Sequence, residues 1–570
     1  MTTRIALALV ILVAALLTAS TWRVFGHTWD EPEHLAAGIE LLDRGRYEYD
    51  TEHPPVGRIL MALGPYLAGA RSYGTPPPDG VQEGIDILYR SGHYDLFLTL
   101  ARLGMLPFLV LLLWTTWLWG RRVGASESEA LLAVVLVASV PPILGHAALA
   151  TLDVAAAGTT LLALYTAQQW IVTGKWQHAV YFGLAAGLAF ATKFSAIPFI
   201  VLGAAVLAIA RLAMNVPQPF SLKAKLGGLA VALVAVTIPI ILAYGIHSAD
   251  PALVTQRFNW GLGYLLRDHP AVLGAVTTVT SHIWLPRGLK LLTEGIAAVK
   301  GHNDTGHVSF LLGNLKANGW WYFYLVALAV KTPLPLLAAS PVGLVIMTRD
   351  GWRERNPWRV APLLLFVTLL VFASTFSHIN IGIRHMLILY PFLALAGAYA
   401  LSKAWHALEQ LRQRSHHLFL LGRAAIIVIV GWQVSTLWTS HPDYLAYFNE
   451  AVAEPQHVLV DSDLDWGQDL RRLEIRLQEL KVPHVNLAYL GTADLQREPL
   501  PPFTRLGPNQ PVTGWVAITA LEREHWPQGF LWLDAYKPLE RVGKTIDLYY
   551  ISQRSQPPPA TPPVGASQSS

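Results

Sequence analysis

The sequence predicts a polytopic α-helical membrane protein that carries a small α/β domain after its last span. Three observations support this fold class. Of the 570 residues, 53% are hydrophobic and only 14% are charged, which is less charge than soluble proteins of this length carry. Long apolar stretches recur as far as residue 440, and beyond it short strand-like segments alternate with an amphipathic helix.

About eleven stretches are long and apolar enough to cross a bilayer as helices. They lie at residues 4–22, 96–119, 129–147, 154–172, 177–192, 195–212, 226–245, 321–347, 360–377, 385–402 and 424–439. The pair within 177–212 is the weakest, because Lys193 interrupts it and both halves are short. The first stretch has features of a signal peptide, but "LTAS" is only a loose cleavage site and many spans follow, so we expect an uncleaved first helix.

Basic residues mark one side of the membrane. If the spans alternate in direction, most basic loop residues fall on the same side: those at 120–122, 175, 223, 225, 349–355 and 403–423. The positive-inside rule assigns this side to the cytoplasm, so the N-terminus is expected there. An odd number of spans then places loops 23–95 and 246–320, and the segment after 440, outside the inner (plasma) membrane.

Three parts are expected along the chain: a membrane domain at 1–439, an extracytoplasmic α/β domain at 440–554 and a disordered, Pro/Ser-rich tail at 555–570. In the second part, "HVLVDS", "HVNLAYL", "GWVAIT" and "IDLYYIS" have the pattern of strands, and "DWGQDLRRLEIRLQELK" that of an amphipathic helix. The chain has no Cys, which excludes disulfides, thiolate nucleophiles and Cys-ligated metals. The net charge of +4 is small and no basic patch is interleaved with aromatics, so no nucleic-acid partner is expected.

The segment "HTWDEPEHLAAG", residues 27–38, places acidic residues just after the first span. The following pattern predicts a short amphipathic helix that stops at Gly45. The helix dipole favours ionised carboxylates at Asp30 and Glu31, and such a carboxylate could act as a general base toward a hydroxyl. The alternative is that Asp30 caps the helix while Glu31 and Glu33 decorate its first turn.

Asp153 stands alone between two apolar spans, at an outer turn of the expected topology. It either caps the next helix or faces a site, and His146 nearby has the same two explanations. Lys193, Arg384 and His385 lie at the outer ends of other spans. Each cation either extends toward lipid head groups or contributes to a site.

Lys331 lies deeper, after the aromatic run "WWYFY" and before two prolines that are expected to break the helix around the charge. An ionisable group at that depth is a functional candidate. Taken together, the acidic and cationic residues suit group transfer from a lipid phosphate, with a fixed Lys or Arg stabilising the departing oxygen in place of a metal. Because a fixed cation can take the place of a metal, no cofactor is expected to be required. The alternative is a divalent metal held by Asp30, Glu31 and Asp153.

Several segments resemble one enzyme family: "WDEPEHLAAG", "HPPVGRIL", "GHAALATLDVAAAG", "ATKFSAIP", "GHVSFLLGNLKANGWWYFYLVALAVKTPL", "RHMLILYPF" and "HPDYLAYFNEAV…DSDLDWGQDL". In order and spacing they are similar to GT-C type membrane glycosyltransferases related to protein O-mannosyltransferases and aminoarabinose transferases. The match extends over most of residues 20–470 and is nearest to a prokaryotic subgroup with an extra outer C-terminal domain. The resemblance therefore implies a GT-C-like membrane domain.

The resemblance also implies an inverting transfer of a sugar from a polyprenyl-phosphate donor to a hydroxyl of a protein, lipid or cell-envelope glycan. Its implied site residues fall into three groups by role. The expected base is Asp30, with Glu31 beside it; donor or acceptor is positioned by Asp153, His34, His53 and His307; the lipid phosphate is held by Lys193, Arg384 and His385. That Lys331 also contacts the carrier is an inference from its depth. The sensory β-trefoil insert of the mannosyltransferases is missing. The C-terminal domain also differs, so the acceptor cannot be carried over from the family, and neither can the donor sugar.

Two rival functions remain open. A transporter or flippase of an anionic lipid or lipid-linked sugar would also need intramembrane cations, but predicts a charge-lined path through both halves of the bilayer. A receptor or scaffold would use the C-terminal domain. In that domain, "DSDLDWGQDL" is not an EF-hand, because Gly467 comes one place late and Arg472 replaces the final Glu. It is either a strand end that leads into a capped helix or a site for a divalent ion or sugar hydroxyls.

Overall fold

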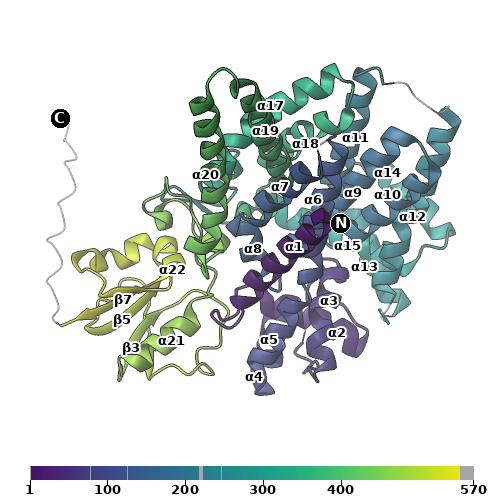
Figure 1. Cartoon of the computed structure of the whole chain (residues 1–570). Helices are drawn as coiled ribbons and strands as arrows, with labels where there is room; N and C mark the ends of the chain where they lie inside the picture. Colours follow the sequence, from purple (N-terminus) through teal and green to yellow (C-terminus); the bar gives the residue numbers. More distant parts are fainter. Residues whose placement is uncertain are drawn as a thin grey trace, which may run out of the picture.

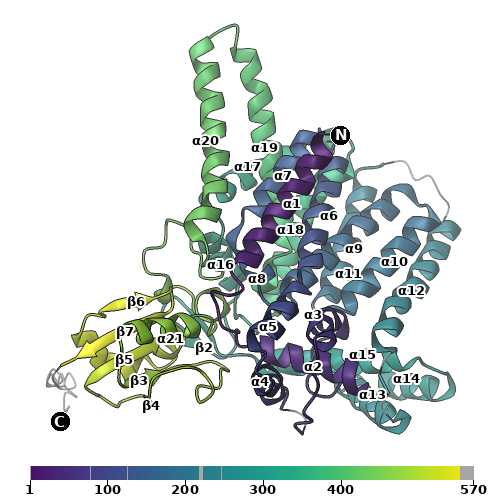
Figure 2. The same ribbon diagram turned by 60° about the horizontal axis from the view of Figure 1, so that its bottom comes forward.

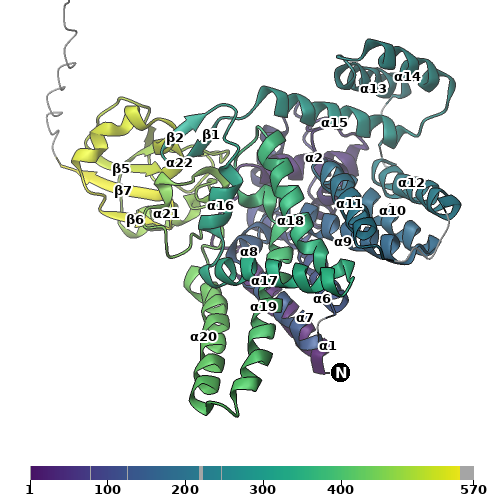
Figure 3. The same ribbon diagram turned by 90° about the horizontal axis from the view of Figure 1, so that it is seen from above.

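The computed structural model describes residues 2–76, 79–124, 126–216, 222–245, 247–248 and 250–552. Most of them are helical, and the expected tail at 555–570 lies outside the described residues. Figures 1, 2 and 3 show a bundle of long helices with a smaller sheet domain at its side. The predicted class, a polytopic helical protein with a C-terminal α/β domain, is confirmed.

Six helical segments of the described chain are long and apolar enough to cross a membrane. They are α1 (Thr2–Ser20), α5 with α6 (Tyr94–Leu103 and Leu106–Arg122), α11 (Ala196–Ala213), α12 (Leu222–Tyr244), α18 (Pro357–Phe376) and α20 (His416–Ser440). Two bent pairs raise the number to eight if each pair is one span: α7 (Glu127–Ala138) with α8 (Pro141–Ala147), and α16 (Phe323–Lys331) with α17 (Leu334–Arg353).

This number is lower than the eleven spans expected from the sequence. The three remaining ranges do contain helices, namely α9 (Asp153–Thr173), α10 (Trp176–Phe190) and α19 (Leu389–Leu411), but these are shorter or less apolar. Neighbouring helices surround α9 and α19 over most of their length, including every residue from Leu389 to Tyr399. Helices buried in this way need less apolar surface than helices that face lipid.

The prolines after Lys331 break the helix there, as the sequence predicts. The axes of α16 and α17 differ by 119° across the break. Such a turn exposes backbone carbonyls and places Lys331 at the corner, where its side chain is fully buried.

The segments between spans form a layer at one end of the bundle. Its elements are α2 (Glu31–Arg44), α3 (Pro55–Leu67), α4 (Gly80–Arg90), α13 (Pro251–Leu265), α14 (Pro270–His282), α15 (Arg287–Thr305), β1 (Ser309–Leu311) and β2 (Asn314–Lys316). Figure 2 shows this layer and the C-terminal domain at one end, and the N-terminus with the α19–α20 connection at the other. We call the former the outer end. The arrangement agrees with large loops that all emerge on one side.

Gly45 ends α2 as predicted: its φ is 63° and its N–H donates to the carbonyl of Leu41. A left-handed residue costs glycine little, and the bond satisfies an otherwise free helix carbonyl.

The C-terminal domain is a five-stranded sheet in the order β4-β3-β5-β7-β6. Its strands are β3 (Val485–Ala488), β4 (Phe503–Arg505), β5 (Gly514–Thr519), β6 (Glu540–Val542) and β7 (Ile546–Ile551). Strand β3 pairs in parallel with β4 and β5, and β7 pairs antiparallel with β5 and β6. Helix α21 (Leu470–Glu479) packs its apolar face on the sheet, while the short α22 (Ala520–His525) follows β5. Three of the four expected strands and the helix are confirmed.

The expected strand "HVLVDS" is wrong. Residues 455–457 and 461–463 form 3-10 turns instead. Bonds to the membrane part hold this segment: Leu312 N–H donates to Val458 O, Ser462 Oγ donates to Ile381 O, and Ile383 N–H donates to Asp463 Oδ1. Because these partners lie outside the sheet, the segment packs against the helices rather than pairing as a strand.

Candidate functional site

One cavity of about 1150 Å³ lies at the outer end of the bundle, between the first outer loop (residues 23–95), α9, α15, α18 and the turn before α19. Eight residues predicted from the sequence line it: Asp30, His34, His53, Asp153, Lys193, His307, Arg384 and His385. Two predicted residues, Glu31 and Lys331, do not line it. The structure therefore gathers residues that are up to about 350 positions apart in the chain.

Four charged side chains alternate in sign along one wall of this cavity. Arg384 Nη1 donates to Asp30 Oδ2 at 2.6 Å and lies 3.8 Å from Asp153 Oδ2. Lys193 Nζ donates to Asp153 Oδ1 at 2.6 Å. Asp153 is almost fully buried, with 1% of its side chain exposed, whereas 26% of the Asp30 side chain is exposed. We call this arrangement of Asp30, Arg384, Asp153 and Lys193 the charge row; it is neutral in sum, and Asp30 is its most open carboxylate.

Local structure explains why these carboxylates face the cavity. Asp30 occupies the N-cap position of α2, but its side chain makes no capping bond and turns to Arg384 instead. Asp153 is the first residue of α9, and the N-cap position belongs to Leu152. The capping alternative, open for both residues in the sequence, therefore does not describe either side chain.

The C-terminal domain completes the charge row with a residue that sequence reasoning missed. The Trp466 ring lies under the guanidinium of Arg384, with Cζ 4.4 Å from the ring centroid. Trp466 is 2% exposed. It is the last residue of "DSDLDW" and directly follows the three alternating Asp residues, which are the only part of this segment that the sequence marks as a candidate site. A buried cation–π contact of this kind orients the guanidinium as well as stabilising it.

Glu31 has a different role from its neighbour Asp30. Its carboxylate accepts from Arg102 Nε and Nη2, each at 2.8 Å, and from the backbone N–H groups of Thr28 and Ala150. Burial alone would raise the pKa of Glu31, but the Arg102 guanidinium and these hydrogen bonds hold it below its usual value. Glu31 therefore anchors the first outer loop to α5. The alternative metal set of Asp30, Glu31 and Asp153 is not brought together, because the lone pairs of Glu31 point to Arg102.

A second cluster lies beside the charge row. Arg58, which is fully buried, donates to His34 Nδ1 at 2.9 Å and bonds the carboxylate of Asp50. His53 Nδ1 lies 2.9 Å from Asp50 Oδ2. Ligand atoms of His34, Asp50 and His53 lie within 4.8 Å of one another, as a metal would require. However, Arg58 occupies His34 Nδ1 and adds a fixed positive charge, so these residues fit a divalent ion poorly. Burial, with Arg58 second, keeps the pKa of His34 well below its usual value.

Three further cavity residues were not assigned to the site from the sequence: Glu33, Glu52 and His302. Burial, with the charge of Asp50 second, raises the pKa of Glu33 to about 7. On the opposite side, His302 of α15 lies 2.8 Å from Glu52, and their hydrogen bond raises the pKa of His302. The predicted His307 is next to His302, with ring centroids 5.8 Å apart. Glu33 thus exchanges its proton near neutral pH, and His302 holds its proton more firmly than a free imidazole does.

Lys331 lies at the junction with the C-terminal domain. Its Nζ donates to the carbonyls of Leu445 at 2.9 Å and Asp463 at 2.6 Å, and it lies 4.3 Å from the centroid of the Phe448 ring. The sequence made Lys331 a candidate because of its expected depth in the membrane. In the structure, the protein itself buries the side chain. Its contacts hold the broken helix against the segment that leads into the sheet domain.

One wall of the cavity is apolar. Ile197, Pro198 and Phe199 of α11 face it, as do Phe372 and Phe376 of α18. The rings of Phe199 and Phe372 pack edge to face, with centroids 6.1 Å apart. Both helices are candidate spans, so the apolar wall continues into the region expected to contact lipid. A ligand with a charged head and an apolar chain would match these two walls.

Comparisons with known proteins give the following matches. No protein-family model and no curated protein matches the sequence. Among solved structures, the chain is similar to ArnT from Cupriavidus metallidurans bound to undecaprenyl phosphate, with 14% identity and a TM-score of 0.46 over 95% of this chain and 97% of that chain. Its apo state gives 13% identity and the same TM-score and coverage. The S. cerevisiae protein O-mannosyltransferase Pmt1-Pmt2 complex bound to the sugar donor gives 17% identity and a TM-score of 0.34, over 43% of this chain and 34% of that chain.

Proposed function

We propose that this protein is an inverting glycosyltransferase that moves a sugar from a polyprenyl-phosphate donor to an acceptor hydroxyl. We propose further that it does so in the inner membrane, with the outer end facing away from the cytoplasm. The charge row beside an apolar wall is the observation that carries this proposal. Two cations suit a phosphate, the apolar wall suits a polyprenyl chain, and a partly exposed carboxylate suits a general base.

Arg384 and Lys193 would hold the donor phosphate. In the charge row, each of these cations is bound to a carboxylate that a phosphate would have to replace or share. Arg384 offers a planar fork, which matches phosphate oxygens in a bidentate way, while Lys193 acts as a point charge. When Arg384 turns to the phosphate, Asp30 loses its partner and becomes free to accept a proton.

The reaction then follows from the position of Asp30. Its carboxylate takes the proton of the acceptor hydroxyl, while the acceptor oxygen attacks the anomeric carbon from the side opposite the phosphate. A new C–O bond forms, the bond between the anomeric carbon and the phosphate oxygen breaks, and polyprenyl phosphate leaves. Arg384 and Lys193 stabilise the negative charge that develops on the leaving oxygen, as an oxyanion hole does. The fixed cations supply this stabilisation, so we expect no metal requirement.

Sugar transfer by the purified protein in proteoliposomes tests the proposal. The protein is supplied with a panel of radiolabelled polyprenyl-phosphate sugars and a membrane extract as acceptor source. We expect wild type to label an acceptor, and Asp30→Asn to lower the rate by at least about a hundredfold, since general-base catalysis contributes about 10²–10⁴. Asp268→Asn, which alters a carboxylate that is 80% exposed, should retain full activity.

Two controls separate the rivals. EDTA should leave the rate unchanged, and a rate that depends on added divalent ions would contradict the metal-free mechanism. If wild type transfers no sugar from any donor but moves a labelled lipid between leaflets, the transferase proposal fails and the flippase alternative takes its place.

A further inference from the structure

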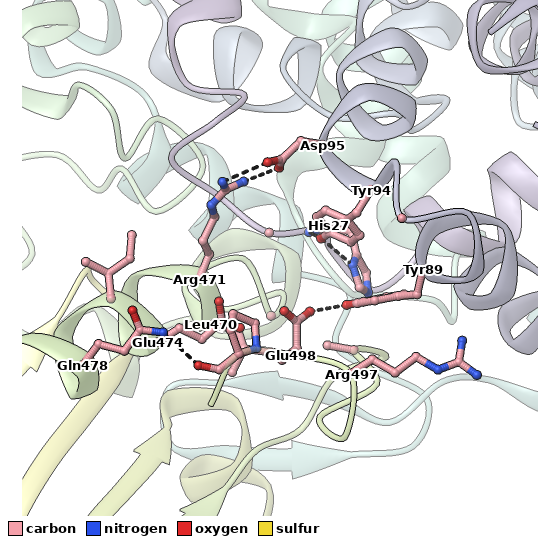
Figure 4. A pocket seen from close by; sticks show the side chains of 16 residues that line it. His27, Tyr89, Tyr94, Asp95, Leu470, Arg471, Glu474, Gln478, Arg497 and Glu498 are labelled. Atoms are coloured by element: carbon pink, nitrogen blue, oxygen red, sulfur yellow. Dashed lines mark hydrogen bonds and ion pairs between the residues drawn. The ribbon is translucent and has the colours of Figure 1, made fainter. Parts of the chain in front are cut away.

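A second cavity, of about 420 Å³, lies where the C-terminal domain meets the first outer loop. It shares no lining residue with the larger cavity. Figure 4 shows its walls: His27 from the loop after α1, Tyr89 and Tyr94 from α4 and α5, Glu474 from α21, and Glu498 from the loop between β3 and β4. We call it the junction pocket.

The arginines of the junction pocket already have carboxylate partners. Arg471 bonds Asp95 at 2.5 and 3.1 Å, as the dashed lines in Figure 4 mark. Arg497 pairs with Asp86 at 3.0 Å and with Asp494 at 3.1 Å. These contacts leave two other acidic groups of the pocket, Glu474 and Glu498, without an ion-pair partner in the part of the chain that the structure describes.

Glu474 and Glu498 face each other instead. Glu474 is 4% exposed, and Oε1 of its carboxyl group has no hydrogen-bond donor within the described residues. Glu498 accepts a hydrogen bond from the hydroxyl of Tyr89. Burial, with the hydrogen bond to Glu498 second, raises the pKa of Glu474 to about 9. At neutral pH the Glu474 carboxyl group therefore keeps its proton.

We propose that the junction pocket binds an organic ammonium ion, whose N–H groups bridge the carboxyl groups of Glu474 and Glu498. The volume is that of a site for a small organic molecule and far exceeds a bare ion. Two carboxyl groups also offer too few oxygens for Ca²⁺, which takes six to eight. Tyr89 and Tyr94, whose ring centroids lie 4.9 Å apart, add aromatic surface that attracts a cation.

Binding in this way releases one proton to solvent for each ammonium ion bound. The ligand keeps its charge, while the Glu474 carboxyl group loses its proton and becomes negatively charged. The affinity for the ammonium ion therefore rises with pH. The rise is about tenfold for each pH unit at pH values below the pKa of Glu474.

The junction pocket adjoins the proposed active site through the backbone. Gly26 N–H donates to Gln468 O, and Trp29 N–H donates to Trp466 O, each at 3.1 Å. These two segments form part of the pocket wall and continue into Asp30 and Trp466. An ammonium ion in the pocket would thus contact both segments that hold the charge row, but its binding does not depend on the reaction proposed there.

Calorimetry on the full-length protein in detergent tests the proposal, with 1,5-diaminopentane as the probe. Titrations in two buffers of different ionisation heat give the number of protons released. We expect binding with release of one proton, and a Kd about tenfold lower at about pH 7.5 than at about pH 6.5. Glu474→Gln, which mimics the protonated carboxyl group, should weaken binding at least about tenfold and abolish proton release.

The control is Glu479→Gln on the same helix, because Glu479 is exposed, pairs with Arg476 and does not line the pocket. It should bind as wild type does. Glu498→Gln, measured in the same way, provides a second variant if Glu474→Gln does not fold. The proposal is overturned if wild type does not bind the diamine, if both glutamine variants bind it unchanged, or if glucose binds without proton release while the diamine does not.

Discussion

Arg384 Nη1 donates a hydrogen bond of 2.6 Å to Asp30 Oδ2, although 354 positions separate the two residues in the chain. The bond joins the loop after α1 to the turn before α19. It also occupies the guanidinium that our proposal assigns to the donor phosphate. Phosphate and Asp30 therefore compete for one cation, so that donor binding and release of the base are coupled.

We expect Arg384→Gln to lower kcat/KM for sugar transfer by roughly 10²–10³, because it removes a fixed charge at the developing phosphate anion. Arg384→Lys should recover only part of this loss, since Lys lacks the planar fork. Transfer rates at several donor concentrations measure both effects. Equal activity of Arg384→Gln and wild type would remove Arg384 from the phosphate site.

Lys193→Ala should raise the KM for the donor by about tenfold, since a charged hydrogen bond to phosphate is worth about 1.5–3 kcal/mol and Lys193 is shared with Asp153. The double variant Lys193→Ala with Asp153→Asn tests the pairing. It should lose less activity than the product of the single losses, because one interaction is removed twice. Strictly multiplicative losses would argue that the two residues act separately.

Much of the proposed site could be predicted from single residues in the sequence. Asp30, Asp153, Lys193 and Arg384 are charged residues at the ends of apolar stretches, and alternation of the spans places all four at one end. Their pairing could not be predicted, since it depends on how α9, α11 and the turn before α19 pack. The sequence also could not separate Asp30 from Glu31, because neighbours on a helix point about 100° apart and only packing decides which one faces the cavity.

Glu31→Gln should destabilise the protein by about 3–5 kcal/mol, because it leaves the buried Arg102 without its charge partner. Thermal unfolding of the detergent-solubilised protein measures this as a lower Tm. Adding Arg102→Met to Glu31→Gln should restore part of the loss by removing the uncompensated charge. Full stability of Glu31→Gln alone would contradict the anchoring role.

Glu33 is expected to make stability fall as pH rises from about 4.5 to about 7. Burial, with the charge of Asp50 second, raises the folded-state pKa of Glu33 to about 7, above the usual value of 4.5. In this window the folded state binds more protons than the unfolded state, so stability decreases with pH. Tm measured across the window should fall less in Glu33→Gln than in wild type. Parallel curves for the two proteins would contradict the raised pKa.

Trp466 should act as a positioning residue that links the C-terminal domain to the charge row. Its ring lies under Arg384, and its neighbours Asp463 and Gln468 bond the membrane part and the first outer loop. Trp466→Ala removes the ring that orients the guanidinium, so we expect a loss of kcat/KM of roughly thirtyfold, in line with the about 2 kcal/mol of a desolvated cation–π contact.

A loss of folding would also lower activity. Activities are therefore compared between variants that have the same Tm. Trp466→Phe keeps a ring under Arg384 and should recover most of the activity, whereas Trp466→Leu supplies an apolar side chain without a ring and should not. Trp526→Ala alters a tryptophan of the same domain that is 55% exposed and should behave as wild type. If Phe and Leu variants of equal Tm transfer sugar equally well, the ring does not orient Arg384, and the C-terminal domain serves the site only by packing against it.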